Sequence, residues 1–394
     1  MANNNENKIL NVPNLRFPEF SGEWVTKSIN DLAVVIGGGT PDTTVKSYWD
    51  GEIQWFTPSE IGKNKYVDSS LRTITEVGLN NSSAKLLPPN TILLSSRATI
   101  GECSLSLREC ATNQGFQCLV SKKCNVDFLY YLIQTKKKDL IRKSCGSTFL
   151  EISANEVRKI QVSVPSDVEQ QKIAELLSLI DERIATQNKI IEKYESLIKG
   201  LNNILLYGTE GKYVCLGDIL LERSERSRTN NQHEVLSSTV KGIFSQREYF
   251  SKDIASENNV GYKIIRLHDV VLSPQNLWMG NINYNDRFEI GIVSPSYKVF
   301  SIADGFDNQF VAAMLKTYRA LYSYMMVSEQ GASIVRRNLN MEAFLQLVFK
   351  IPSLDKQREI GYAISLLKYQ LKTANKIIRA YISQKKYLLR QMFI

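Results

Sequence analysis

Two segments of the chain carry polar side chains of the kinds that hydrogen-bond to nucleic acids. Each segment begins as an apolar stretch typical of a strand and continues as a polar loop that closes on glycine. The first spans residues 92–101 and contains Arg97, and the second spans residues 270–280 and contains Gln275 and Asn276. Such side chains can pair with base edges or phosphate oxygens. An ordinary surface turn is the alternative interpretation, and the recurrence of the pattern favours a binding role.

The sequence lacks the motifs that would make the chain an enzyme by itself. It has only two histidines, His233 and His268, so a catalytic site built on a histidine cluster is excluded. The glycines at 37–39 match neither phosphate-loop pattern, and we expect a tight turn there. No pair of the six cysteines has the C-x-x-C spacing, and we expect reduced, mostly buried thiols. We therefore predict no catalytic residue and no metal site.

Composition and charge set wider limits. With 394 residues, 43% of them hydrophobic and 23% charged, the chain has globular composition and length for two or three domains. No apolar run approaches the ~18 residues that a membrane helix needs. The polar start at residues 1–8 predicts no signal peptide. We therefore expect a cytoplasmic protein without a membrane partner, and the net charge of +9 is compatible with a nucleic-acid partner.

The elements that would position these loops belong to an internal duplication. When the sequence is shifted by 187 residues, 15 of the 43 positions in 165–207 are identical to those in 352–394. The same shift superimposes residues 29–32 on residues 216–219. The two repeats, about 24–207 and 211–394, are alike at their ends and differ in their middles, which read as mixed α/β.

Each repeat ends in a predicted long helix. The first begins after Pro165-Ser166, and apolar residues recur along both copies in two heptad seams. The first copy carries a net charge of −2 and the second a net charge of +7. This complementarity favours pairing of the two helices in a coiled coil. The alternative is that each helix packs only on its own domain.

Taken together, these features resemble the specificity (S) subunit of bacterial type I restriction–modification systems. Residues 11–24 resemble the family's opening segment, and residues 36–41 resemble its turn after the first strand. Residues 164–173 (VPSDVEQQKI) resemble the start of its conserved helix. In the second copy, Lys356-Gln357 stands where the family pattern has Glu-Gln, so contacts there are less certain.

The resemblance implies an α+β fold of two mixed α/β target recognition domains, separated by a long antiparallel two-helix coiled coil, with internal duplication and pseudo-twofold symmetry. The expected segments are an N-terminal segment at 1–23, recognition domains at 24–163 and 209–350, and coiled-coil helices at 164–208 and 351–394.

The resemblance also implies a non-catalytic role. Each recognition domain would read one half of a bipartite, non-palindromic site on double-stranded DNA. Two modification (methyltransferase) subunits and two restriction (translocase and nuclease) subunits would assemble on the chain. It would bind no cofactor directly, and S-adenosylmethionine, ATP and Mg²⁺ would bind to the partner subunits. The alternative from a different class is a two-headed coiled-coil adaptor that binds proteins without reading DNA, and a stand-alone nuclease or methyltransferase is disfavoured by the missing motifs.

Candidate contacts follow from this reading. The DNA-binding candidates are polar or basic residues of the variable middles: Thr57, Ser59, Ser95, Ser96, Arg97, Thr99, Ser237, Lys241, Ser273, Gln275, Asn276, Arg336 and Arg337. The partner-binding candidates are alike in both copies but lie off the heptad seams, which suggests a shared site for two identical partners: Gln170, Asn188, Lys189, Gln357, Asn375 and Lys376.

Overall fold

The computed structural model describes residues 10–146, 150–207, 210–249, 258–330 and 337–394. It divides into two compact units, each described here by itself. Unit 1 contains residues 1–189 together with 376–394, and unit 2 contains residues 190–375. Arg336, one of the DNA-binding candidates, lies outside the described residues. Among the described residues, no helix is both long enough and apolar enough to span a bilayer.

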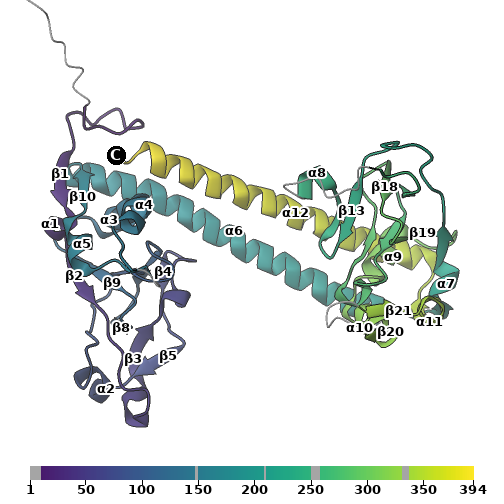
Figure 1. The fold of residues 1–394 in the computed structure, drawn as a ribbon, viewed down its shortest axis with the longest axis horizontal. Coiled ribbons are helices and arrows are strands. Elements are labelled where there is room, and N and C mark those ends of the chain that lie inside the picture. Colours follow the sequence, from purple (N-terminus) through teal and green to yellow (C-terminus); the bar gives the residue numbers. More distant parts are fainter. Residues whose placement is uncertain (1–9, 147–149, 208–209, 250–257, 331–336) are drawn as a thin grey trace, which may run out of the picture. The chain divides into compact units, whose positions relative to one another are not determined.

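Unit 1 contains a five-stranded mixed sheet and a smaller three-stranded sheet (Figure 1). The strand order of the larger sheet is β2-β9-β6-β7-β4: Ala33–Gly37, Gln117–Ser121, Ile92–Leu94, Cys103–Ser106 and Tyr66–Val67. The smaller sheet has the order β5-β3-β8: Arg72–Ile74, Trp49–Phe56 and Cys110–Thr112. A separate antiparallel pair joins β1 (Val25–Ser28) to β10 (Gln161–Val164). The short helices are α1 (Ile29–Leu32), α2 (Glu76–Asn80), α3 (Val126–Thr135), α4 (Lys137–Arg142) and α5 (Ala154–Lys159).

Unit 2 repeats the central part of this arrangement. Its four-stranded antiparallel sheet has the order β12-β19-β16-β17: Leu220–Arg223, Lys298–Ile302, Val270–Leu272 and Ile282–Tyr284. Four strand pairs accompany it: β11-β22 (Lys212–Cys215, Val348–Ile351), β13-β14 (Leu236–Thr239, Gly242–Ser245), β15-β18 (Lys263–Arg266, Ile290–Val293) and β20-β21 (Ser328–Gln330, Arg337–Leu339). The short helices are α7 (Leu216–Ile219), α8 (Gln246–Tyr249), α9 (Asn308–Met314), α10 (Tyr318–Met326) and α11 (Met341–Leu345).

The duplication and the mixed α/β repeats are confirmed by these elements. The pairs β1 and β11, α1 and α7, and β10 and β22 are each offset by the 187 residues that relate the two halves of the sequence. The strand order β2-β9-β6-β7 in unit 1 corresponds to β12-β19-β16-β17 in unit 2. Apart from the shared sheet and the equivalent pairs β1-β10 and β11-β22, the strands differ between the units, as the unlike middles predicted.

The two predicted long helices are also confirmed. They are α6 (Asp167–Tyr207) and α12 (Leu354–Gln391), of 41 and 38 residues. Asp167 and Glu169 lie in the first turn of α6, where negative charge is favourable beside the free backbone N–H groups. Glycine is rare and proline absent within both helices, so each continues for roughly 60 Å at 1.5 Å per residue.

Within unit 1, the last turns of α12 run antiparallel beside the first half of α6. The core there includes Ile173 and Leu177 from α6 and Leu388 and Met392 from α12. The Lys385 ammonium lies 2.7 Å from the Asp181 carboxylate, and neither side chain is more than 17% exposed. The same core contains α3 residues, so α6 packs on its own domain as well as on α12.

Candidate nucleic-acid interface

The first predicted loop connects β6 to β7 and is held in a compact shape by its own bonds. The Ser95 N–H donates to the carbonyl of Glu102 (2.9 Å), and the Gly101 N–H donates to the carbonyl of Ser95 (3.1 Å). The buried Ser95 hydroxyl donates to the Arg97 carbonyl (2.8 Å) and accepts from the Thr99 hydroxyl (3.0 Å). Ser95 therefore fixes the loop from inside, while Thr99 is exposed and Arg97 is half-buried at its tip.

The tip of this loop also contains backbone strain. Ala98 has a φ of 53°, in the left-handed region that non-glycine residues seldom adopt. Among the described residues, the buried hydroxyl of Ser96 has no hydrogen-bond partner. Both features cost free energy in the isolated chain, and such features cluster at binding sites.

The cations beside the loop are paired with carboxylates. The Arg97 Nε lies 2.8 Å from the Glu151 Oε1, and the Lys137 ammonium forms an ion pair with Glu102. These four side chains line a hollow of about 880 Å³. All four are between 36% and 44% exposed, so solvent screens the pairs and they can exchange partners at little cost.

Thr57 and Ser59 lie at the end of the neighbouring strand β3. Thr57 is held in a capping box, where its hydroxyl donates to the Glu60 carboxylate (2.6 Å), and Ser59 is exposed. The segment 113–116 links this turn to the β6–β7 loop: the Asn113 N–H donates to the carbonyl of β3 residue Phe56 (3.1 Å), and the Gly115 carbonyl accepts from Ser96 N–H (2.8 Å). Unit 1 thus brings both groups of its DNA-binding candidates to one edge.

The second predicted loop connects β16 to β17, the strands equivalent to β6 and β7. The Ser273 carbonyl accepts from the Asn276 N–H (3.1 Å), and the Gln275 carbonyl accepts from the Arg337 N–H (3.2 Å). The Arg337 guanidinium carbon lies 5.1 Å from the centre of the Trp278 ring. Ser273, Gln275, Asn276 and Arg337 therefore lie together, although Arg337 comes from a segment more than 60 residues later in the chain.

Ser237 and Lys241 belong to the β13–β14 hairpin, which is joined to the same loop. The Lys316 ammonium donates to the carbonyls of Gly280 (2.8 Å) and Val240 (3.3 Å). Burial, followed by repulsion from Lys368, lowers the pKa of Lys316 to about 8. The Ser237 hydroxyl is buried against Gln246, whereas Lys241 is exposed at the turn.

A buried amide cluster supports this edge. The Ser238 hydroxyl donates to Asn281 (2.8 Å) and accepts from the Asn283 amide (2.7 Å). Sequence reasoning missed these residues and Lys316, because single Asn, Ser and Lys residues in variable segments carry no periodic signal. The alternation of Asn281, Asn283 and Asn285 along β17 (Ile282–Tyr284) and its two flanking residues was the one available indication of a buried polar face.

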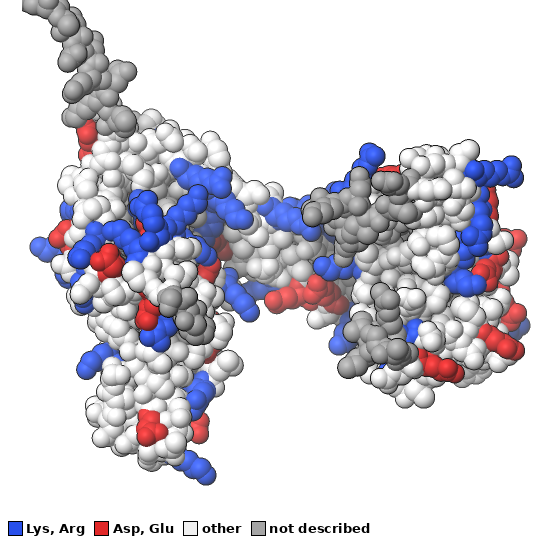
Figure 2. Space-filling view, in the orientation of Figure 1, with Lys and Arg blue, Asp and Glu red and all other residues white. Residues whose placement is uncertain are grey.

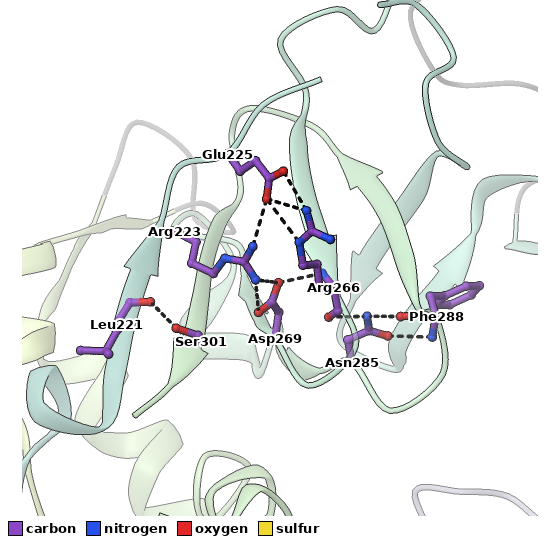
Figure 3. Close-up of polar contacts among 8 residues, drawn as sticks. All are labelled: Leu221, Arg223, Glu225, Arg266, Asp269, Asn285, Phe288 and Ser301. Atoms are coloured by element: carbon purple, nitrogen blue, oxygen red, sulfur yellow. Dashed lines mark hydrogen bonds and ion pairs between the residues drawn. The ribbon is translucent and has the colours of Figure 1, made fainter. Parts of the chain in front are cut away.

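The other prominent polar cluster of unit 2 has its charges paired (Figure 3). Arg223 contacts both oxygens of the buried Asp269 (3.0 and 3.1 Å), and Glu225 bridges Arg223 and Arg266. Burial raises the pKa of Asp269. Asn285 completes the cluster by donating to the carbonyls of Arg266 (2.8 Å) and Phe288 (2.7 Å). This cluster stabilises the turn before β16 and so supports the strand that leads into the second loop.

Basic side chains gather on one part of unit 1. Figure 2 shows a band of Lys and Arg across the region where Figure 1 places α3 and α4. The sequence at and beside α4 has five cations within eight residues: Lys136, Lys137, Lys138, Arg142 and Lys143. The α4 helix also carries Lys137, which lines the hollow beside the first loop. Lys137 of α4 therefore lies beside the β6–β7 loop.

The partner-binding candidates divide into two groups. Asn188, Lys189 and Lys376 are exposed and Asn375 is half-buried, so a partner could reach them. Gln170 and Gln357 are each only 2% exposed and are bonded internally.

Gln170 and Gln357 form equivalent hydrogen bonds in the two repeats. Gln170 accepts from the N–H of Asn125, the residue that caps α3, and donates to the Pro165 carbonyl (both 3.0 Å). Gln357 accepts from the N–H of Asp307, which caps α9, and donates to the Pro352 carbonyl (both 3.0 Å). Their identity in the two copies is explained by this bridge without any partner.

The family model described as the type I restriction modification DNA specificity domain matches residues 21–196. The chain is 40% identical over 179 residues to the type I restriction enzyme MjaIX specificity subunit of Methanocaldococcus jannaschii, a match that covers 43% of this chain and 41% of that protein. It is 31% identical over 175 residues to the type I restriction enzyme EcoR124I/EcoR124II specificity subunit of Escherichia coli, a match that covers 42% of this chain and 43% of that protein. The matched part thus spans about two fifths of the length of these relatives.

Solved structures extend the likeness in fold to nearly the whole chain. The S subunit of a type I restriction–modification system from M. genitalium matches with a TM-score of 0.61 at 16% identity, covering 97% of this chain and 99% of that one. A chain from a structure of the type I R-M system, solved for its assembly and conformational transition, matches with a TM-score of 0.54 at 12% identity, covering 95% and 97%. The S-subunit fold is therefore shared by both repeats.

Proposed function

We propose that this chain is a member of the type I restriction–modification DNA specificity family, whose model matches residues 21–196, and that it is the subunit that selects the DNA sequence on which such a system acts. It has no catalytic role in this proposal. Each unit reads one half of a bipartite site in double-stranded DNA, through the loop between β6 and β7 in unit 1 and the loop between β16 and β17 in unit 2.

One observation carries the proposal: the two loops occupy the same place in equivalent sheets but present different side chains. The β6–β7 loop presents Arg97 and Thr99, whereas the β16–β17 loop presents Gln275 with Arg337 beside it. Arg pairs best with guanine and Gln with adenine in the major groove. Because different side chains occupy equivalent loops of the two units, the two half-sites should differ in sequence, and the whole site should be non-palindromic.

The partners follow from the same role. Two modification subunits would dock near the exposed Asn188-Lys189 and Asn375-Lys376 blocks and methylate adenine with S-adenosylmethionine. Two restriction subunits would complete a complex that uses ATP and Mg²⁺. The chain itself would bind none of these cofactors, and the assembly would act in the cytoplasm. Among the described residues, no cluster of His, Cys, Asp or Glu is suited to hold a metal ion.

Duplex binding at increasing salt tests DNA reading against a protein-only adaptor. We expect the chain, in complex with modification subunits, to bind its duplex with an affinity that falls steeply with salt, because phosphate contacts release counterions. The Arg97→Ala variant should lose about 1–3 kcal/mol of binding to the cognate duplex. Arg108→Ala is the matched control, because Arg108 follows the opposite end of β7 and pairs with Asp68 on the surface. Binding that is absent at low salt, or equal losses in both variants, would contradict the proposal.

A further inference from the structure

Unit 2 contains a hollow of about 1040 Å³ where the base of the domain meets the start of α12. Its lining comes from the segment before β11, the end of β22 and the first turn of α12: Glu210, Gly211, Lys212, Lys350, Ile351, Pro352, Ser353 and Lys356. Three of these eight residues are lysines and one is a glutamate, so the lining is basic.

The equivalent positions of unit 1 are covered by the chain's own N-terminal segment. The residues 187 positions before the lining are 23–25, 163–166 and Glu169. Asn11 makes three hydrogen bonds to two of them: its backbone carbonyl accepts from the Trp24 N–H (2.8 Å), its amide donates to the Trp24 carbonyl (2.6 Å), and its side-chain oxygen accepts from the Ser163 hydroxyl (2.8 Å).

Ion pairs hold the rest of the N-terminal segment against unit 1. The Arg16 guanidinium makes two hydrogen bonds of 2.8 Å to the buried Glu169 carboxylate. One turn further along α6, Lys172 pairs with Glu19 of the same segment. A polypeptide in this slot is therefore recognised by an anion at position 169 and a cation at position 172.

Both charges are reversed in unit 2. Lys356 stands where unit 1 has Glu169, and Glu359 stands where unit 1 has Lys172. Gly211 replaces Trp24, whose indole in unit 1 packs edge-on to Phe128 and donates to the Glu169 carboxylate (3.3 Å). Among the described residues, Lys356 pairs with Glu359 on its own helix (2.8 Å), and the two side chains are 39% and 70% exposed. Such a surface pair is weak and can exchange for an incoming partner.

We propose that this hollow binds an extended peptide segment of a partner protein, one that presents a carboxylate to Lys356 and a cation to Glu359. The inference goes beyond DNA reading and does not depend on it. Polypeptide is favoured over DNA because polypeptide fills the equivalent slot of unit 1. The N-terminal segment of a second copy is excluded, since its Arg16 would face Lys356.

The test uses fluorescein-labelled peptides of residues 10–20 and the full chain, with binding followed by fluorescence anisotropy. One peptide has the natural sequence, and the other carries R16E and E19K, which leaves its net charge unchanged. The chain is used as wild type and as the K356E/E359K variant, which also keeps its net charge. Non-specific electrostatic attraction is therefore the same in all four combinations.

The charge-reversed peptide should bind the wild-type chain at least about tenfold more tightly than the natural peptide does, because like charges face each other in the mismatched pair. In the K356E/E359K chain this preference should invert. Failure of the charge-reversed peptide to bind, or binding unaffected by K356E/E359K, would overturn the proposal. Loss of duplex affinity in K356E/E359K without peptide binding would instead assign the hollow to phosphate. No DNA or modification subunit enters the peptide assay, so its failure leaves the proposed function untouched.

Discussion

Replacing Gln170 or Gln357 with methionine should destabilise the chain strongly, although both residues were predicted from the sequence to bind a partner. Methionine keeps the length and much of the shape of glutamine but forms no strong hydrogen bond. In each repeat the change leaves two backbone groups without their partner: the N–H of the residue that caps a helix, and a proline carbonyl. The glutamine side chain that now bonds to these groups is buried in both repeats.

The magnitude follows from those two lost bonds. Leaving one buried backbone group unsatisfied costs about 1–3 kcal/mol, and water can restore part of the loss. We therefore expect each variant to lose about 2–4 kcal/mol of unfolding free energy. Gln170 also accepts from the Cys124 thiol (3.2 Å) and donates to Asp167 (3.2 Å), so its replacement should be the more costly of the two.

Urea denaturation followed by tryptophan fluorescence measures the change, and binding to a modification subunit is measured in parallel. Asn188→Ala is the control, because Asn188 is exposed on α6 and its removal should change stability by no more than about 0.5 kcal/mol. A loss below about 1 kcal/mol in both glutamine variants would refute the structural role. Unchanged stability with lost binding of the modification subunit would restore the partner role.

Three further outcomes are expected. Arg16→Met should cost about 3–5 kcal/mol in urea denaturation, because it leaves the buried Glu169 carboxylate without its cation; a loss under about 1 kcal/mol would contradict this. Iodoacetamide should label the exposed Cys145 and spare Cys103 at pH 8 in the native chain, because burial raises the pKa of the Cys103 thiol to about 12; equal labelling by mass spectrometry would contradict this. Between about pH 8 and 10 the unfolded chain should hold a proton that Lys316 has lost in the folded chain. Stability should therefore rise with pH more steeply in the wild type than in Lys316→Met, and parallel curves would count against the lowered pKa.

The duplicated elements could be predicted because they leave patterns in the sequence that can be recognised without knowing the three-dimensional structure. The heptad seams and the Pro-Ser start located α6 and α12, and the 187-residue shift located the paired elements at the ends of each repeat. The two polar loops were found for the same reason, since an apolar strand followed by a glycine-closed loop is a short-range signal. As DNA contacts, their residues stay predictions.

Long-range contacts could not be predicted. Lys316 bonds both to the second loop, at Gly280, and to the β13–β14 hairpin, at Val240, which lie 36 and 76 residues before it, and nothing in its local sequence distinguishes it from a surface lysine. Gln170 and Gln357 show a different limit. A residue that is alike in both repeats and lies off the seam can either face a partner or hold the start of the helix from inside, and periodicity does not separate these two cases.

Mapping of N6-methyladenine tests the central claim most directly. The chain is co-expressed with a type I modification subunit in cells that lack other adenine methylation, as wild type and as the Arg97→Ala and Gln275→Ala variants. The account predicts a bipartite, non-palindromic methylation motif that depends on this chain. Arg97→Ala should relax one half of the motif and Gln275→Ala the other. A motif that is independent of the chain, or a change in both halves caused by either single variant, would contradict it.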